Sequence, residues 1–300
     1  MPFLAKAKNL NINPKFLPNY RDWSLGFSFY IRKINKQDMK IKLLLLTIVF
    51  GMGAVFANPL AKKRILVYTK NGKGYVHKNI GPSVEAWKKI GEANNLIVDV
   101  SDDPAAMNSK NLAKYDCLVF SNTCNDIFDT EEQRQALVDY IHAGGAYVGV
   151  HSASDSEKDW PWYAAMVGGK FKRHPAFQSF EIKVIDKNHP ATSMLGEKWV
   201  KEDECYYMNE FNPNNQVLLA ADMRTVKDGE KEVYPGRIFG DYLPLAWYHE
   251  FEGARVFYTA LGHDSKDYVD PVFIQHLTGG LLWALDKDSK DSKLKKKSRK

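Results

Sequence analysis

The stretch Gly144-Gly-Ala-Tyr-Val-Gly-Val-His-Ser-Ala153 decides the fold, because a helix-ending glycine pair leads into an apolar strand that stops abruptly at His151. The segment Thr130-Glu-Glu-Gln133 just upstream is a capping box, which opens a helix that continues through Ile141. Helix, glycine turn and buried strand in this order are typical of a parallel α/β sheet. Ligands bind at the carboxyl ends of strands in such sheets, so His151 occupies a site-forming position.

The residues around His151 have the spacing of a nucleophile elbow. Gly149-Val-His-Ser-Ala153 follows the pattern Gly-x-nucleophile-x-small, in which small neighbours permit a sharp turn from strand to helix. The central position here is an imidazole, which serves as general base, hydrogen-bond donor or metal ligand. An imidazole is poorly suited to a lasting acyl intermediate. A histidine that merely ends the strand is the alternative interpretation.

Apolar runs and amphipathic segments alternate along the rest of the chain. Strands are predicted at residues 64–69, 96–100, 115–121, 180–186, 217–221, 245–251 and 255–261, and helices at 82–93, 130–143 and 271–285. This alternation predicts a doubly wound, mostly parallel α/β sheet with right-handed crossovers. The chain changes character after His151, so we expect one domain over residues 64–285 with an elaborated second half.

The ends of the chain differ in charge from the body. Residues 1–57 carry a net charge of +7 and residues 287–300 carry +6, so the total of +6 leaves −7 on residues 58–286. An acidic body has no electrostatic footprint for nucleic acid. The basic tail 287–300 is interpreted as a solvated, disordered end, with a weak contact to an anionic surface as the alternative.

Residues 39–57 have the pattern of a secretory signal peptide. A basic start at Met39 precedes an uncharged apolar run over 43–56, and small residues precede Asn58. The run is too short to span a membrane comfortably, so we expect an exported, periplasmic or extracellular protein without a stable membrane span. Residues 1–38 are then an extension from an upstream start codon. The alternative is an N-terminal anchor behind a cytoplasmic extension.

Polar side chains follow several predicted strands. His77 lies in the loop after the first strand, His263 follows the strand over 255–261, and Glu204 lies in the segment 202–206. Loops after parallel strands meet at one edge of the sheet, so these residues are expected to meet His151 there. Three histidines and a carboxylate would suit zinc or another divalent ion, although no HExxH pattern is present. A proton-transfer site without metal is the favoured hypothesis.

Several further residues are candidates for contact with substrate. Tyr206, Trp247 and Trp162 have rings that could stack on the apolar face of a sugar, with core packing as the alternative for each. Ser152 and Asp264 follow directly on two of the candidate histidines and are expected to bind substrate hydroxyls.

Two other groups of residues are excluded from leading roles. Adjacent residues on an extended segment point to opposite faces, so Asp203 and Glu204 do not form a glycosidase pair and at most one serves the site. The other is expected to form an ion pair, for example with Arg237. The three cysteines have no CxxC spacing and allow at most one disulfide. Cys124 lacks a local activating motif, which argues against a nucleophile.

One ordered set of motifs covers nearly all of residues 64–285. These are Gly74-Tyr-Val-His77, Gly149-Val-His-Ser-Ala153, Gly169-Lys-Phe171 with His174-Pro175, His189-Pro190, Asp203-Glu-Cys-Tyr206, Pro244-Leu-Ala-Trp247 and Leu261-Gly-His263. The set resembles the ThuA-like family, which is associated with trehalose utilisation. The resemblance implies a flavodoxin-like sheet similar to class I glutamine amidotransferases, and a sugar-processing role. It does not imply amidotransferase activity, because His151 stands where those enzymes carry cysteine.

The sequence and the resemblance together predict an exported enzyme of carbohydrate catabolism, a hydrolase or lyase acting on a disaccharide or keto-glycoside. His151 is the expected general base or acid, His77 and His263 orient hydroxyls or share the proton, and Glu204 sets imidazole charge and tautomer. A small carbohydrate is the expected partner, and a divalent metal is an open alternative cofactor. The rival hypothesis is a non-catalytic sugar-binding module that inherited an enzyme fold without its nucleophile.

Overall fold

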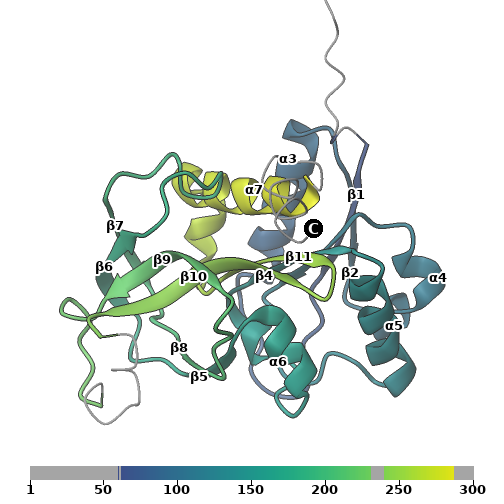
Figure 1. The fold of residues 1–300 in the computed structure, drawn as a ribbon, viewed down its shortest axis with the longest axis horizontal. Coiled ribbons are helices and arrows are strands. Elements are labelled where there is room, and N and C mark those ends of the chain that lie inside the picture. The colour runs from purple at the N-terminus through teal and green to yellow at the C-terminus, as the bar shows by residue number, and fades with distance from the viewer. Residues whose placement is uncertain (1–59, 61, 231–239, 287–300) are drawn as a thin grey trace, which may run out of the picture. The chain divides into compact units, whose positions relative to one another are not determined.

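A single large sheet organises the structure, a computed structural model that describes residues 60, 62–230 and 240–286 (Figure 1). The strand order is β2-β1-β3-β4-β11-β10-β9-β6-β7. The first five strands in this order run parallel, and each later strand is antiparallel to its neighbour. The predicted segments 1–38, 39–57 and 287–300, and Arg237, lie outside the described residues.

The strands of this sheet are β1 (Arg64–Tyr68), β2 (Ile97–Ser101), β3 (Cys117–Ser121), β4 (Ala146–Val150), β6 (Gln178–Val184), β7 (Lys198–Asp203), β9 (Gln216–Asp222), β10 (Tyr242–Phe251) and β11 (Ala254–Thr259). A separate pair consists of β5 (Lys170–Arg173) and β8 (Tyr207–Asn209). The helices are α3 (Ile80–Ala93), α4 (Ser109–Leu112), α5 (Glu131–His142), α6 (Pro161–Val167) and α7 (Pro271–Leu285), with short 3-10 helices η4 (Pro104–Ala106), η5 (His151–Asp155) and η7 (Ser265–Val269).

From the adjacent strands β1 and β3, successive strands are added toward opposite edges of the sheet. The chain passes from β1 through α3 to β2 on one side, and from β3 through α5 to β4 on the other. Right-handed crossovers in opposite directions place their helices on opposite faces. Figure 1 shows α3 and α7 over one face, with α5 and α6 on the other. The predicted doubly wound α/β fold with an elaborated second half is confirmed.

A local sequence signal explains where α5 begins. Thr130 Oγ1 accepts a hydrogen bond from the Gln133 amide at the start of α5, as the capping box predicts. The Gln133 side chain accepts a hydrogen bond from the Asp129 amide and not from the Thr130 amide, which a complete capping box would use.

The edge strand β7, antiparallel to β6, was not predicted because its sequence, KWVKED, is mostly charged. Charged side chains are typical of edge strands, where they discourage pairing with another chain.

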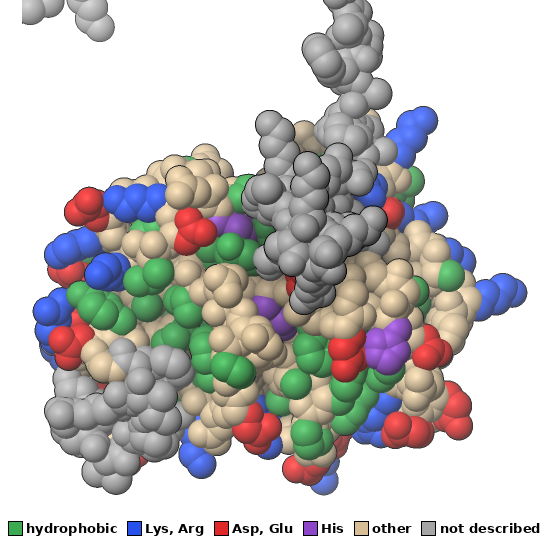
Figure 2. All heavy atoms as spheres, in the orientation of Figure 1, with side chains coloured by type: hydrophobic (Ala, Val, Ile, Leu, Met, Phe, Trp, Pro, Cys, Tyr) green, Lys and Arg blue, Asp and Glu red, His purple; other side chains and the backbone are tan. Residues whose placement is uncertain are grey.

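The described surface carries charges of both signs. Figure 2 shows Lys and Arg side chains interspersed with Asp and Glu around the margin of one face, with hydrophobic and uncharged side chains between them. The described part of this face therefore presents no extended basic strip of the kind that binds a polyanionic backbone. Among the described helices, none combines the length and apolarity that crossing a bilayer requires.

Helix α7 packs closely through two glycines, Gly279 against the loop at Pro190 and Gly280 against Phe257 of β11. A Cβ atom added at Gly279 would lie 2.2 Å from the carbonyl oxygen of Pro190, and one at Gly280 would lie 2.4 Å from the ring of Phe257. Real Cβ atoms essentially never come so near another heavy atom, so α7 reaches this position only because both residues lack a side chain.

We expect Gly279→Ala to lower the free energy of unfolding by about 1–3 kcal/mol, because the backbone around Pro190 must move. Gly196→Ala is the control, since this glycine is exposed and its Cβ would come no nearer than 3.9 Å to the Lys198 carbonyl oxygen, an ordinary contact. That variant should be unchanged or up to about 1 kcal/mol more stable. Urea denaturation measures both, and equal stability of the two variants would contradict the close approach of α7.

Candidate functional site

His151 sits on a strained turn at the end of a buried strand. All five residues of β4 are buried, and His151 follows with a φ of +54°, in the left-handed region that non-glycine residues rarely adopt. The 3-10 helix η5 begins at the same residue, so strand, sharp turn and helix follow one another as in a nucleophile elbow. The Tyr258 hydroxyl donates to the His151 carbonyl at 2.7 Å and helps to hold this conformation.

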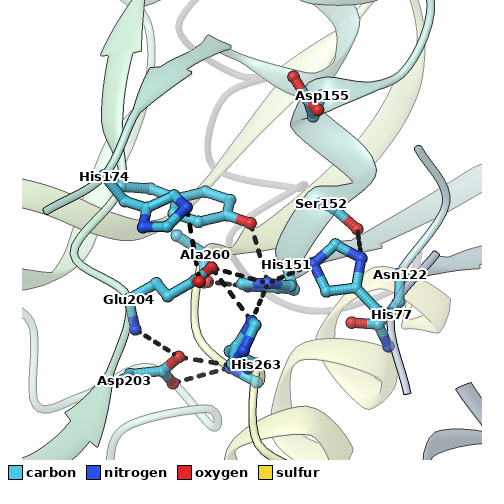
Figure 3. Close-up of polar contacts among 12 residues, drawn as sticks. His77, Asn122, His151, Ser152, Asp155, His174, Asp203, Glu204, Ala260 and His263 are labelled. Atoms are coloured by element: carbon cyan, nitrogen blue, oxygen red, sulfur yellow. Dashed lines mark hydrogen bonds and ion pairs between the residues drawn. The ribbon is translucent and has the colours of Figure 1, made fainter. Parts of the chain in front are cut away.

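Four side chains from distant parts of the sequence meet at this turn (Figure 3). His151 Nε2 lies 3.2 Å from His77 Nε2 and 3.4 Å from His263 Nδ1. Glu204 Oε2 lies 3.1 Å from His263 Nδ1 and 3.5 Å from His151 Nε2. We call these four residues the histidine–glutamate cluster. Their donor atoms all lie within 4.8 Å of one another.

The sheet topology explains why Glu204 reaches the other three residues. His77, His151 and His263 follow the parallel strands β1, β4 and β11. Strand β7 lies at the far edge of the sheet, but four successive antiparallel pairings separate it from β11. It therefore runs in the same direction as β11. Its carboxyl end, just before Glu204, lies at the same edge of the sheet.

The hydrogen bonds of His151 fix its tautomer. Its Nδ1 lies 2.8 Å from the carbonyl oxygen of Ala260, which can only accept, so Nδ1 carries the proton. Burial in the cluster lowers the pKa of His151 well below its ordinary value, and neighbouring His77 lowers it further. The imidazole is therefore neutral, and the Nε2 lone pair points into the cluster. The Tyr206 hydroxyl lies 2.8 Å from this nitrogen and is placed to donate to it.

The pKa values of the other three cluster residues shift in different directions. Burial lowers the pKa of His77 to about 4, with a further contribution from His263, so His77 is neutral at pH 7. The hydrogen bond to Glu204 instead raises the pKa of His263. Burial tends to raise the pKa of Glu204, but the hydrogen bond from His263 and the positive charge of nearby histidines lower it overall. Two imidazoles of the cluster are thus neutral, and the opposite pKa shifts of His263 and Glu204 both favour a charged pair between them.

Asp203 supports the cluster from behind. Its Oδ1 accepts hydrogen bonds from the amides of Glu204 and His263, at 2.9 and 3.2 Å, and its Oδ2 accepts from the amide of Gly262 at 2.9 Å. Lys201 Nζ lies 3.5 Å from Oδ2 and also pairs with Asp267. The adjacent carboxylates therefore diverge, with Glu204 in the cluster and Asp203 holding the backbone of its neighbours.

The predicted substrate-binding residues lie in different surroundings, and only some of them contact the cluster. Ser152 Oγ lies 3.3 Å from His77 Nδ1, and buried Tyr206 contacts His151, so both support histidines rather than offer an open face. Asp264 caps η7 by accepting from the Lys266 amide. The sugar platform expected at Trp247 is corrected: this ring is fully buried, and its Nε1 donates to the Val167 carbonyl at 2.9 Å.

Trp162 and Cys124, which were also considered from the sequence, lie outside the cluster. Trp162 stacks on Trp160 and donates from Nε1 to Glu252 at 2.9 Å. Cys124 donates to Asp155 at 3.2 Å, and burial raises the pKa of its thiol to about 12, so it is not poised as a nucleophile. The three cysteines are buried and form no disulfide with one another.

Three residues that were not predicted as site residues from the sequence border the cluster. His174 follows β5, and its Nε2 lies 3.4 Å from Glu204 Oε1. The rings of Tyr75 and Phe177 lie 4.8 and 5.6 Å from those of His77 and His263, with 61% and 39% of their surfaces exposed. His174 and Tyr75 lie in motifs quoted above, but nothing in the sequence shows that Tyr75 and Phe177 are exposed.

Comparison with known proteins identifies the family. The model of the ThuA family, described as trehalose utilisation, matches residues 64–284. The chain belongs to the ThuA family. Membership indicates a role in carbohydrate catabolism. A search among curated proteins found no significant match.

Solved structures confirm the fold of this ThuA-family protein. A ThuA-like protein from Bacteroides uniformis is 20% identical, with a TM-score of 0.61 over 78% of this chain and 95% of that one. A ThuA-like protein from Parabacteroides merdae is also 20% identical, with a TM-score of 0.60 over 76% and 92%. A cytoplasmic protein from Salmonella typhimurium is 12% identical, with a TM-score of 0.52 over 73% and 98%. At these identities the likeness concerns the fold alone.

We expect Asp203→Asn to lower the free energy of unfolding by about 1–3 kcal/mol, because an amide cannot accept all three backbone hydrogen bonds and stay paired with Lys201. Asp264→Asn makes the same chemical change nearby and should be nearly neutral, since asparagine is as good a helix N-cap. Urea denaturation at pH 7 compares them. An Asp203→Asn variant as stable as Asp264→Asn would refute this role for Asp203.

Proposed function

We propose that this ThuA-family protein is an enzyme of carbohydrate catabolism that acts on a disaccharide or keto-glycoside at the histidine–glutamate cluster. One observation carries the proposal. His151 is held on an elbow-like turn with a neutral, unprotonated Nε2 that faces two imidazoles and a carboxylate. Such a buried group with a strongly shifted pKa, at the carboxyl edge of an α/β sheet, is characteristic of catalytic sites.

The surroundings of the cluster support a sugar as the substrate. Tyr75 and Phe177 are exposed aromatic residues that contact two of its histidines. Aromatic rings bind the apolar face of a sugar while polar groups bind its hydroxyls. These two residues take the place of Trp247 as the proposed platform.

The charges of the cluster fit acid–base chemistry. His151 accepts a proton through Nε2, either from a sugar hydroxyl or from the acidic carbon next to a keto group. His263, protonated beside Glu204, returns a proton to the departing glycosidic oxygen. On a keto-glycoside this pair of transfers completes an elimination, with the carbon–oxygen bond breaking as the carbon–carbon double bond forms.

Removal of the His151 imidazole tests the proposal. We choose His151→Asn, because asparagine tolerates the positive φ and forms hydrogen bonds but does not titrate. Turnover of native and keto-disaccharides should fall by on the order of 10²–10⁴, with little change in sugar affinity. His142→Asn, at an exposed histidine paired with Glu252, is the control.

The same experiment distinguishes the rival function. A non-catalytic sugar-binding module would bind these sugars without turnover in the wild type, and would lose affinity on Tyr75→Ala or Phe177→Ala. Normal turnover by the His151→Asn variant would show that this imidazole does not carry the chemistry.

We propose further that the protein is exported, because residues 39–57 have the pattern of a signal peptide. Mass spectrometry of the protein from the native host should then find a mature chain beginning near Asn58, outside the cytoplasm. Recovery of a chain beginning at Met1 from the membrane fraction would contradict export by this route.

A further inference from the structure

We propose that the histidine–glutamate cluster binds one divalent transition-metal cation, such as Zn²⁺, through His77 Nε2, His151 Nε2, His263 Nδ1 and Glu204 Oε2. The inference goes beyond the proposed function. It depends on the arrangement of these atoms and holds whether or not the protein turns over a sugar.

The separations between the four atoms fit a shared cation. Zinc binds histidine nitrogen and carboxylate oxygen at about 2.0–2.2 Å, so two such atoms in a tetrahedral site lie about 3.3 Å apart. The separations among His151, His263 and Glu204 are 3.1, 3.4 and 3.5 Å, and His77 lies 3.2 Å from His151. The other two separations, from His77 to Glu204 and His263, lie within 4.8 Å. Two ligands of one zinc span at most about 4.2 Å, so the His77 ring must move toward the other three residues on binding wherever its separation exceeds that value. That side of the cluster is the widest.

Hydrogen bonding alone leaves the cluster crowded. His151 Nε2 has one lone pair, because Nδ1 carries the proton that is donated to Ala260. Tyr206 is the nearest donor to that lone pair, at 2.8 Å. His77 Nε2 and His263 Nδ1 approach the same nitrogen at 3.2 and 3.4 Å, although one lone pair cannot accept from all three. A cation at the common centre resolves the crowding once His263 Nδ1 releases the proton that it donates to Glu204 and the Tyr206 hydroxyl turns away from His151, because each nitrogen then directs its lone pair at the metal.

The groups behind the four atoms are arranged as they are around known metal ligands. Metal-binding histidines usually make a hydrogen bond through the other ring nitrogen, which fixes the tautomer and orientation of the ring. His151 Nδ1 donates to the Ala260 carbonyl, and His77 Nδ1 lies 3.3 Å from Ser152 Oγ. The second oxygen of Glu204 lies 3.4 Å from His174 Nε2.

The donor set selects the class of cation. Three imidazole nitrogens and one carboxylate oxygen suit zinc and neighbouring first-row metals. Mg²⁺ and Ca²⁺ prefer oxygen ligands, of which the cluster supplies one residue, Glu204. When bound, such a cation would occupy His151 Nε2 and His263 Nδ1, so in that form neither nitrogen would transfer a proton. The cation would instead lower the pKa of a sugar hydroxyl that coordinates it.

Direct titration tests the inference. The purified protein, with any affinity tag removed, is treated with chelator and titrated with Zn²⁺ against a chromophoric chelator, with Mg²⁺ in parallel. We expect about one Zn²⁺ per chain and no comparable Mg²⁺ binding. His77→Gln and Glu204→Gln should each weaken Zn²⁺ binding by on the order of 100-fold or more, and His142→Gln should leave it unchanged. Circular dichroism confirms that each variant is folded.

A second measurement applies to the wild type alone, in case a variant fails to fold. Co²⁺ added to the chelator-treated protein should give the intense visible absorption that is typical of four-coordinate Co²⁺. Zn²⁺ should displace the Co²⁺ and abolish this absorption. Wild-type protein that binds no Zn²⁺, or variants that bind it as tightly as wild type, would overturn the inference. Undiminished sugar turnover by metal-free protein would leave the proposed function standing and remove the metal from it. Stoichiometric binding without sugar turnover would support this inference and count against the proposed function.

Discussion

The buried carboxylate of Asp203 is the contact on which the geometry of the candidate site most depends. It accepts three backbone hydrogen bonds, from Gly262, His263 and Glu204, and so joins the end of β7 to the end of β11. These two strands are separated by three others in the sheet. Burial raises the pKa of Asp203, while Lys201 and the backbone amides act against this rise. Because the carboxylate binds the amides of both Glu204 and His263, it holds these two residues side by side although they lie far apart in the sequence.

A second constraint acts at His151, whose backbone is strained while its ring is fixed. Positive φ at a non-glycine residue costs on the order of 1–3 kcal/mol and persists only where surrounding contacts determine it. The Tyr258 hydroxyl supplies one such contact, at the His151 carbonyl, and the Ala260 carbonyl supplies another, at the ring. Gly149 makes this packing possible, because a Cβ there would lie 3.0 Å from the Tyr258 ring. Strain and packing together present Nε2 to the cluster in a single orientation.

These features explain how far prediction from the sequence could go. The fold followed from apolar runs that alternate with capped helices, and the meeting of His77, His151 and His263 followed from their positions after parallel strands. The expectation that Trp247 binds sugar was wrong because β10 is buried along most of its length. In such a strand, alternation of polar and apolar residues does not indicate which side chains reach the surface. The hydrogen bonds of Asp203 join residues about 60 positions apart, and no local pattern encodes them. The exposure of Tyr75 and Phe177 likewise depends on loop conformations that periodicity does not describe.

The substitution of imidazole for a nucleophile at the elbow changes what this fold can do. A cysteine at that position attacks a carbonyl and needs a single base beside it. His151 instead offers a lone pair, and its neighbours in the cluster are two further imidazoles and a carboxylate, all of which accept protons or bind cations. Such a set stabilises positive charge, whether the charge is a proton in transit or a metal ion. The elbow-like turn thus presents one lone pair at the edge of the sheet, and the residues around that atom suit the proton transfer or metal binding proposed above better than covalent catalysis.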